Sequence, residues 1–406
     1  MGERRLSANG QAQPERSNPR VQQKTKKPKR EKPLIRNVCV YCGSNPGINP
    51  AYVDTAFGPF AAWLVGLLIY LGVQLIASAV VGSVFVRSLS VLIPALGEGA
   101  PRAALLVSIY AVFAWVNVRG GSRGGVKVVQ GVTFAKLAPL ALLIGLGLVG
   151  FRSEFVRWET TPPLEDIGRM AMRLIYLFAG LESVLSLSGE LRDPSRTVPR
   201  GLFLGLATAT TIYLGVQFAA QGLLGPALPA SDRAPLAEAA AVMLGNPGRT
   251  ILLLGGVIST LGYLSADMLA SPRTLFAMAN AGRLPRQLGS VHARYQSPAV
   301  AIALHAALAC GLAIVGDFDT LTALSSSAIL VIYLLCCAAT IVLQRRRVGE
   351  ELNPLRLAGG PTIPLLAIAM VVGLMTTLAR NEVIALLVVI AVAGLSFLAS
   401  RRAASA

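Results

Sequence analysis

Long apolar stretches separated by short polar segments make up the chain from about residue 60 onward. Leu202–Leu224 and Ile251–Ala266 are apolar on all sides, whereas helices of a soluble protein carry polar residues at a period of about 3.6. A helix rises about 1.5 Å per residue, so roughly 20 apolar residues cross about 30 Å of hydrocarbon. The segments that reach or approach this length are Phe60–Val86, Ala103–Val118, Gly131–Phe151, Ile167–Gly189, Leu202–Leu224, Ile251–Phe276, Ala299–Val315, Leu321–Leu343, Ile363–Ala379 and Val383–Leu398.

These ten segments predict an all-α fold, a polytopic bundle of transmembrane helices. The composition agrees, because 54% of the 406 residues are hydrophobic and 14% are charged, against about 25% charged in soluble domains. A soluble globular class is therefore excluded, and membrane lipid is an expected partner. The sequence carries no signal for an oligomeric state.

The net charge of +17 is distributed unevenly along the chain. Eleven of the 37 Lys and Arg residues lie in residues 1–36, which are also rich in Gln, Pro and Ser, so we expect a disordered basic tail or one that contacts anionic headgroups. If the amino terminus is cytoplasmic, the inside loops and the carboxyl end hold sixteen basic residues and the outside loops eight. This bias predicts a plasma or inner membrane protein with both termini cytoplasmic, and it explains the charge without nucleic acid as a partner.

The five cysteines and two histidines predict no metal or cofactor site. Cys39 and Cys42 form a C-x-x-C without the second pair or His cluster that a zinc site needs. His305 lies within a span and is interpreted as an interior group with satisfied hydrogen bonds, the alternative being a proton relay. No catalytic constellation is predicted, so no enzyme is expected, and the lack of an ATP-binding motif does not support a primary pump.

Four charged residues inside the spans stand out: Lys136, Arg173, Glu182 and Asp267. Each costs about 2.5–3.5 kcal/mol at the bilayer centre on insertion scales, so such residues usually face a polar interior. Arg173 is near the outer end of its span, and we expect its side chain to extend to the interface. Lys136 and Glu182 lie deeper, which favours a functional role for them.

The six residues Phe178 to Ser183 place a glycine and other small residues beside an acid in the middle of a span. Glycine weakens a helix, and membrane proteins that bind polar solutes often break a helix at the midplane to expose backbone groups. Close helix packing at Gly180 is the other interpretation. The residues alone leave both open.

Two longer motifs carry a family resemblance. Phe178 to Glu182 (FAGLE) is followed by Gly189 to Arg200 (GELRDPSRTVPR), and Ser271 to Pro285 reads SPRTLFAMANAGRLP. The first stretch is similar to the sixth helix of the amino acid–polyamine–organocation superfamily of permeases, and the second to the end of the eighth helix and the loop after it. The resemblance covers about 340 residues from Pro59 onward. It implies a leucine-transporter-like fold, an inverted repeat of five plus five helices.

The resemblance also implies roles for single residues. Those assigned to an amino-acid or amine substrate are Phe178, Ala179, Gly180, Leu181, Glu182, Ser183 and Asp267, although the superfamily usually has an uncharged residue in place of Asp267. Glu182 and Lys136 are expected to couple protons or ions, Glu182 by linking substrate occupancy to gating. Lys136 matches a fifth-helix lysine that replaces a sodium ion in many members. Glu190, Arg196 and Arg273 are expected to form cytoplasmic ion pairs and to anchor loops.

The amino-terminal part departs from the superfamily. The first span resembles the third helix, so residues 58–406 are expected to correspond to helices three to twelve, with the first two missing. Residues 37–57 instead resemble the opening of the Lonely Guy phosphoribohydrolases, through the run NVCVYCGSNPGINPAY from Asn37 to Tyr52. The sequence lacks the Pro-Gly-Gly-x-Gly-Thr motif of those enzymes.

Three functional hypotheses follow from these resemblances. The leading one is secondary active transport of an amino acid or related amine by alternating access, coupled to protons or to exchange. The second is a membrane remnant that inserts without transporting, because the first two helices are missing. The third is a nucleoside monophosphate phosphoribohydrolase, which needs a catalytic domain where the chain instead continues as membrane spans.

Overall fold

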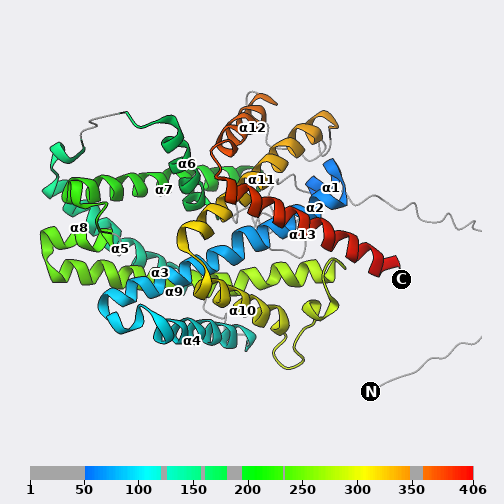
Figure 1. The fold of residues 1–406 in the computed structure, drawn as a ribbon, viewed down its shortest axis with the longest axis horizontal. Coiled ribbons are helices and arrows are strands. Elements are labelled where there is room, and N and C mark those ends of the chain that lie inside the picture. The colour runs from blue at the N-terminus through cyan, green and yellow to red at the C-terminus, as the bar shows by residue number, and fades with distance from the viewer. Residues whose placement is uncertain are drawn as a thin grey trace, which may run out of the picture. The chain divides into compact units, whose positions relative to one another are not determined.

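The structure is a computed structural model that describes residues 51–119, 126–156, 161–180, 194–231, 234–347 and 360–405. Every regular element within these ranges is a helix (Figure 1). The expected basic tail, residues 1–36, and residues 37–50 of the segment that resembles a phosphoribohydrolase lie outside the described residues. The all-α prediction is confirmed.

The helices differ widely in length. They are α1 (Ala51–Phe57), α2 (Pro59–Leu67), the π-helical η1 (Leu68–Leu75), α3 (Ile76–Leu92), η2 (Pro94–Leu96), α4 (Gly99–Val118), α5 (Val126–Gly150), η3 (Ser153–Val156), α6 (Leu164–Phe178), α7 (Pro194–Leu224), η5 (Gly225–Ala227), α8 (Pro235–Leu244), α9 (Asn246–Asn280), η6 (Arg286–Gly289), α10 (Ala299–Val315), α11 (Phe318–Arg345), α12 (Thr362–Met375) and α13 (Arg380–Ser405).

Within the described ranges, six helical runs are long and apolar enough to cross a membrane: Pro59–Leu92, Gly99–Val118, Thr133–Gly150, Arg196–Ala227, Asn246–Asn280 and Phe318–Arg345. Three further predicted spans form shorter apolar helices, at Ala299–Val315, Thr362–Met375 and Glu382–Leu398. The remaining predicted span, Ile167–Gly189, is described only to Gly180, since residues 181–193 are not described. Within it, α6 ends at Phe178. The chain is thus a multi-pass bundle of membrane helices.

The first span is one continuous run of α2, η1 and α3, and it lies antiparallel to α11 (Figure 1). At one end, Arg346 at the end of α11 donates a hydrogen bond of 2.9 Å to the carbonyl oxygen of Thr55 in α1. Farther along, a Cβ added to Gly72 would lie 2.4 Å from the Cβ of Ala328. A side chain at Gly72 has no room, so glycine lets the two backbones approach closely, as small residues do between membrane helices.

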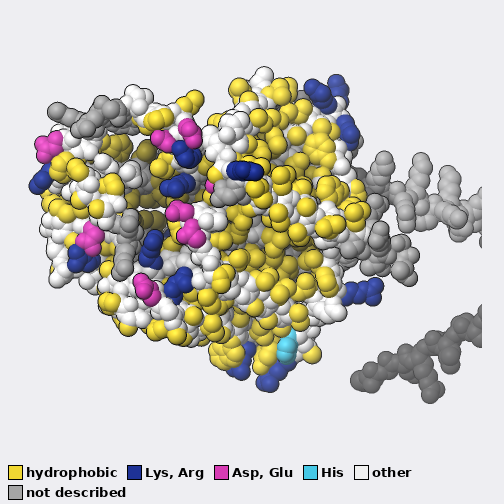
Figure 2. All heavy atoms as spheres, viewed as in Figure 1, with side chains coloured by type: hydrophobic (Ala, Val, Ile, Leu, Met, Phe, Trp, Pro, Cys, Tyr) yellow, Lys and Arg dark blue, Asp and Glu magenta, His cyan; other side chains and the backbone are white. Residues whose placement is uncertain are grey.

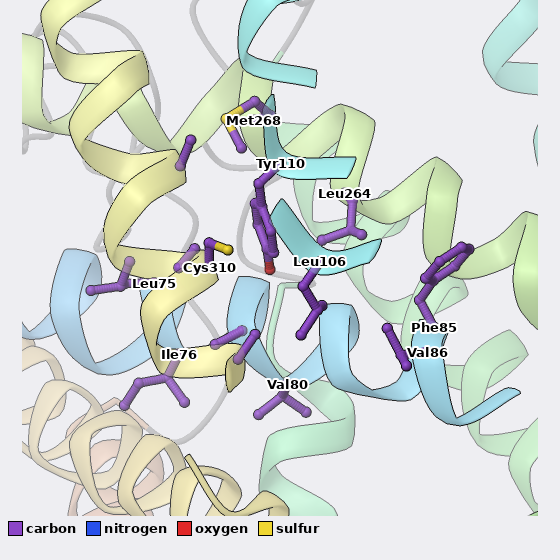
Figure 3. Packing of buried hydrophobic residues seen from close by; sticks show 14 of the residues in the cluster. Leu75, Ile76, Val80, Phe85, Val86, Leu106, Tyr110, Leu264, Met268 and Cys310 are labelled. Carbon is purple, nitrogen blue, oxygen red and sulfur yellow. The ribbon is translucent and has the colours of Figure 1, made fainter. Parts of the chain in front are cut away.

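A large hydrophobic cluster joins the first span to α4, α9 and α10 (Figure 3). Its buried members include Leu75, Leu106, Tyr110, Met268 and Cys310. The Tyr110 hydroxyl donates a 2.7 Å hydrogen bond to the carbonyl oxygen of Ser78, which satisfies the one polar atom of this large side chain. This cluster fixes the positions of α9 and α10 relative to the first span.

A second region, made of α5, α7, α8 and the first part of α9, packs around Leu143, Ala219 and Leu253. Many large apolar side chains of the bundle point outward, among them Phe134 on α5 and Leu204 on α7, which are 76% and 70% exposed. Hydrophobic side chains accordingly cover much of the face drawn in Figure 2, and charged ones gather mostly in its left half and at its edges. An apolar exterior of this kind is suited to contact with lipid tails.

Candidate functional site

A buried hydrogen-bonded chain of polar side chains crosses the interior of the bundle. The Nε2 atom of His305 on α10 lies 3.1 Å from Oδ2 of Asp267 on α9, and the Nδ1 atom of His305 lies 3.3 Å from the hydroxyl of Tyr70 on η1. Ser271, one turn after Asp267, donates to its Oδ1 at 2.5 Å. His305 is fully buried, and Asp267, Tyr70 and Ser271 are at most 7% exposed. Four polar groups from three spans therefore satisfy one another away from solvent.

When Asp267 is ionised and His305 is neutral, the hydrogen-bonding capacity of each group sets the direction of each bond. An ionised carboxylate only accepts, so the Nε2–H of His305 donates to Asp267. In the neutral imidazole the other nitrogen is then an acceptor, and the Tyr70 hydroxyl donates to it. In this arrangement Asp267 carries one negative charge and His305 is neutral.

Apolar and aromatic side chains enclose this chain. Met268 and Cys310, on α9 and α10, belong to the cluster around Tyr110 shown in Figure 3. Tyr176, two residues before the end of α6, packs against the same cluster. The last turn of α6 therefore reaches the region that holds Asp267 and His305.

A second buried polar group lies between the first span and α11. The side-chain oxygens of Gln74, Ser78, Ser325 and Ser326 are buried and have no hydrogen-bond partner among the described residues. The two helices run antiparallel with Gly72 against Ala328, so Gln74 is level with the two serines. We name this group, Gln74, Ser78, Ser325 and Ser326, the polar seam. An unpaired buried polar group costs about 1–3 kcal/mol, so the seam is suited to a polar solute.

Part of the polar seam and the Tyr70 end of the buried chain share the π-helical segment η1, Leu68–Leu75. A π-helix widens the turn and is rare, and it occurs frequently at functional sites. Tyr70 is 1% exposed on this segment, and Gln74 is one turn farther along. The irregular segment thus carries one member of each group, Tyr70 of the buried chain and Gln74 of the polar seam.

The helix break predicted at Phe178 to Ser183 is described in its first half. α6 ends at Phe178, Ala179 is extended (φ −62°, ψ 138°), and Gly180 has φ 105°, a conformation that favours glycine. Tyr213 of α7 holds this end, because its hydroxyl donates to the carbonyl of Leu177 at 3.0 Å and its ring contacts Phe178. Leu181, Glu182 and Ser183 lie outside the described residues, as does Glu190.

The other residues assigned from the resemblance lie at the surface. Lys136 on α5 is exposed, and so are Arg196 near the start of α7 and Arg273 on α9. The guanidinium of Arg273 donates to the carbonyl oxygen of Leu269, one turn earlier on its own helix. Of all the assigned residues that the structure describes, Asp267 is the only one that is buried.

Charged residues gather at the end of the bundle where α11 begins. Arg173 on α6 lies 3.7 Å from Asp319, and both side chains are more than half exposed. These two residues, with Arg169 and Glu382, help to line a pocket of about 300 Å³. Asp317 caps α11, and hydrogen bonds from the backbone N–H and the hydroxyl of Thr320 lower its pKa. An exposed ion pair such as Arg173–Asp319 contributes about 0–1 kcal/mol to stability.

Sequence reasoning assigned no role to Tyr70 or Ser271, although both contribute to the buried chain. It interpreted His305 as an interior group with satisfied hydrogen bonds, and the burial of this side chain and its contacts with Asp267 and Tyr70 confirm that interpretation. One local signal was present, since Asp267 and Ser271 are four residues apart and so share a helix face. Tyr70 and His305 are 235 residues apart in sequence, and nothing local connects them. In the described part of the chain, no three His, Cys, Asp or Glu side chains gather in a way that could hold a metal.

Comparison with known proteins gives a consistent set of relatives. A serine/threonine exchanger of Bacillus subtilis (strain 168) is 27% identical over 327 residues, which are 78% of this chain and 73% of the exchanger. A cadaverine/lysine antiporter of Escherichia coli (strain K12) is 24% identical over 228 residues, 55% of this chain and 51% of the antiporter. An uncharacterised transporter of Mycobacterium tuberculosis (strain ATCC 25618 / H37Rv) is 35% identical over 156 residues, 38% of this chain and 36% of that protein. A family model described as "Amino acid permease" matches residues 47–400.

Proposed function

The chain belongs to the amino acid permease family, and from this premise we propose that it carries a small polar amino acid across the membrane by alternating access. The family consists of transporters and not of enzymes. We further propose that transport is driven by exchange or by protons. The relatives support this assignment, since one is named an exchanger and another an antiporter.

The observation that carries the proposal is the polar seam. Among the described residues, its four side-chain oxygens have no partner although they are buried between apolar spans. Hydroxyl and amide groups can donate to a carboxylate and accept from an ammonium, so they can replace the water that an amino acid loses on entering the membrane. A seam of fixed polar groups without a net charge favours a neutral polar substrate over a dication such as cadaverine.

The end of α6 supports the same proposal. α6 stops at Phe178 within a predicted span, and the backbone groups at such a helix break are suited to a polar solute. We propose that Phe178 to Ser183 form the hinge of the gate and that Glu182 senses substrate. The proposed fold is the inverted repeat of this transporter class. Lys136, Glu190, Arg196 and Arg273 keep their assigned coupling and gating roles as proposals.

The orientation is also a proposal, with both termini cytoplasmic. It is supported by the twofold excess of basic residues in the loops on that side. In this orientation the pocket beside Arg173 and Asp319 faces outward. Cysteine labelling from outside intact cells checks it: a cysteine in place of Thr320 should react with a charged reagent, and one in place of Gln344 should not.

Uptake into proteoliposomes tests the function. Vesicles loaded with unlabelled serine should take up labelled serine and threonine faster than labelled lysine or cadaverine. The double variant Ser325→Ala with Ser326→Ala should lose about tenfold in uptake, because it removes two seam hydroxyls that each contribute about 0.5–1.5 kcal/mol. The matched control is Ser327→Ala, since that hydroxyl already bonds to the carbonyl of Ala323.

Two results would contradict the proposal. Absence of exchange for every amino acid and amine tried would favour a membrane protein that does not transport. Equal uptake by the double variant and by Ser327→Ala would show that substrate does not contact the polar seam.

A further inference from the structure

The polar atoms in the buried chain of Tyr70, His305, Asp267 and Ser271 bond to one another and leave little access for a substrate. Both carboxylate oxygens of Asp267 already accept hydrogen bonds, one from Ser271 and one from His305. Asp267 is 7% exposed and His305 is fully buried, so a solute has little access to them. These groups differ from the polar seam, whose oxygens have no partner among the described residues.

We propose that the His305–Asp267 pair is the proton-binding site that couples transport to a pH gradient. The proposal rests on the proposed transport function and adds the driving ion and its site. A proton from water binds to Nδ1 of His305, the imidazole becomes a cation, and the Tyr70 hydroxyl changes from donor to acceptor. Release of the proton reverses these changes. No bond other than that to the proton is made or broken.

The net charge of these four side chains is the physical reason why a proton should bind here. With His305 neutral, the chain of four side chains carries the single negative charge of Asp267, and a buried charge without a counter-charge is costly. In the described part of the chain, Asp267 has no ion-pair partner other than His305. Adding one proton makes the pair electrically neutral while keeping every hydrogen bond. A proton is therefore the species that lets this part of the bundle rearrange within the membrane without carrying a net charge.

Among the described residues, the surroundings of the pair supply no competing basic group. The ionisable side chains around the pair are Tyr70 on η1, Tyr110 on α4, Tyr176 on α6, Tyr263 on α9 and Cys310 on α10. Arg273 of α9 is exposed and bonds to its own helix. Arg87 on α3 and the charged residues of α11, Asp319 and Arg345, are exposed. Protonation at His305 is thus the local means of neutralising Asp267.

The position of the pair explains how a proton could affect the transport cycle. Its hydrogen bonds join the first span, α9 and α10, and Tyr176 brings the end of α6 against the same cluster. A change of donor and acceptor at Tyr70 acts on η1, the segment that also carries Gln74 of the polar seam. Proton binding and substrate binding therefore meet on one irregular segment.

The test measures accumulation of labelled serine in proteoliposomes under imposed pH gradients, beside exchange of labelled for unlabelled serine without a gradient. If one proton moves with each substrate, the accumulation ratio of the wild type rises by up to about tenfold per pH unit. His305→Gln should retain exchange and lose the response to the gradient. The control Thr274→Ala, at a buried residue of α9 outside the hydrogen-bonded chain, should keep it.

The outcomes separate the two proposals. Wild-type exchange without any response to a pH gradient overturns the proton site and leaves the transport function standing, whereas absence of wild-type transport overturns the function itself. A normal gradient response in His305→Gln also overturns the site. If His305→Gln fails to fold, Tyr70→Phe decides. It keeps the ring and removes the bond to Nδ1, so the gradient response should fall by at least about threefold, and an unchanged response overturns the proposal.

Discussion

Two groups of spans in this molecule are both apolar enough to cross a membrane and have different surroundings. In Pro59–Leu92 and Phe318–Arg345, 67% and 56% of the most apolar window is buried inside the protein, whereas in Thr133–Gly150 and Arg196–Ala227 only 11% and 6% is buried. The buried group carries the polar seam and Tyr70. The exposed group carries outward-pointing residues such as Phe134 and Leu204. Apolar composition therefore identifies a span without revealing whether it faces protein or lipid.

The strongest test of this comparison truncates one leucine side chain in the buried group of spans and one in the exposed group. Leu330 of α11 is fully buried against Met172 and Val371, so Leu330→Ala should destabilise the protein by about 2–5 kcal/mol through lost packing and a cavity. Leu204 of α7 is 70% exposed, and Leu204→Ala should have little effect. Thermal unfolding in detergent micelles measures both. Equal destabilisation would show that the two spans are packed alike.

Glycines provide the second test. A Cβ at Gly72 would lie 2.4 Å from the Cβ of Ala328, and Gly72→Val should cost about 1–3 kcal/mol or more because α11 must move. Gly145 of α5 has no heavy atom within 4 Å of an added Cβ, so Gly145→Val serves as the matched control and should be tolerated. The yield of monodisperse protein and its unfolding temperature are the measurements. A stable Gly72→Val variant would contradict the close approach of the first span and α11.

The sequence predicted the helical class and the approximate positions of the spans, because both follow from hydrophobic patterning within single segments. It also singled out Asp267 and the end of α6 near Phe178, since an acid or a glycine inside an apolar run is visible locally. It could not predict the buried chain, whose members come from η1, α9 and α10. The π-helical turn at Leu68–Leu75 likewise has no local signal, because tertiary packing determines it.

A smaller effect is expected for Tyr110. Its hydroxyl donates to the carbonyl oxygen of Ser78 in a buried contact between α4 and the first span. Tyr110→Phe keeps the ring and removes this bond, so we expect a loss of about 0.5–1.5 kcal/mol. Tyr213→Phe, on the exposed span α7, removes a hydroxyl whose bond to Leu177 is exposed, and should cost less. The two unfolding temperatures, measured under the same conditions, provide the comparison, and a larger loss for Tyr213→Phe would reverse it.

The smallest effect is expected at the exposed start of the buried span α11. The Asp317 carboxylate accepts hydrogen bonds from the backbone N–H and the hydroxyl of Thr320, and these bonds hold its pKa below the ordinary value of 3.8. A carboxyl whose pKa is lower in the folded than in the unfolded chain contributes stability above its unfolded pKa and loses it as pH falls through the folded one. The cap should therefore act fully at neutral pH and weaken only below about pH 4. Amide hydrogen exchange in the first turn of α11 should become faster in Asp317→Ala at pH 7, and Asp317→Ser, which can still cap the helix, should retain most of the protection. Equal exchange in Asp317→Ala and the wild type would show that packing of the buried span, and not its cap, fixes where α11 begins.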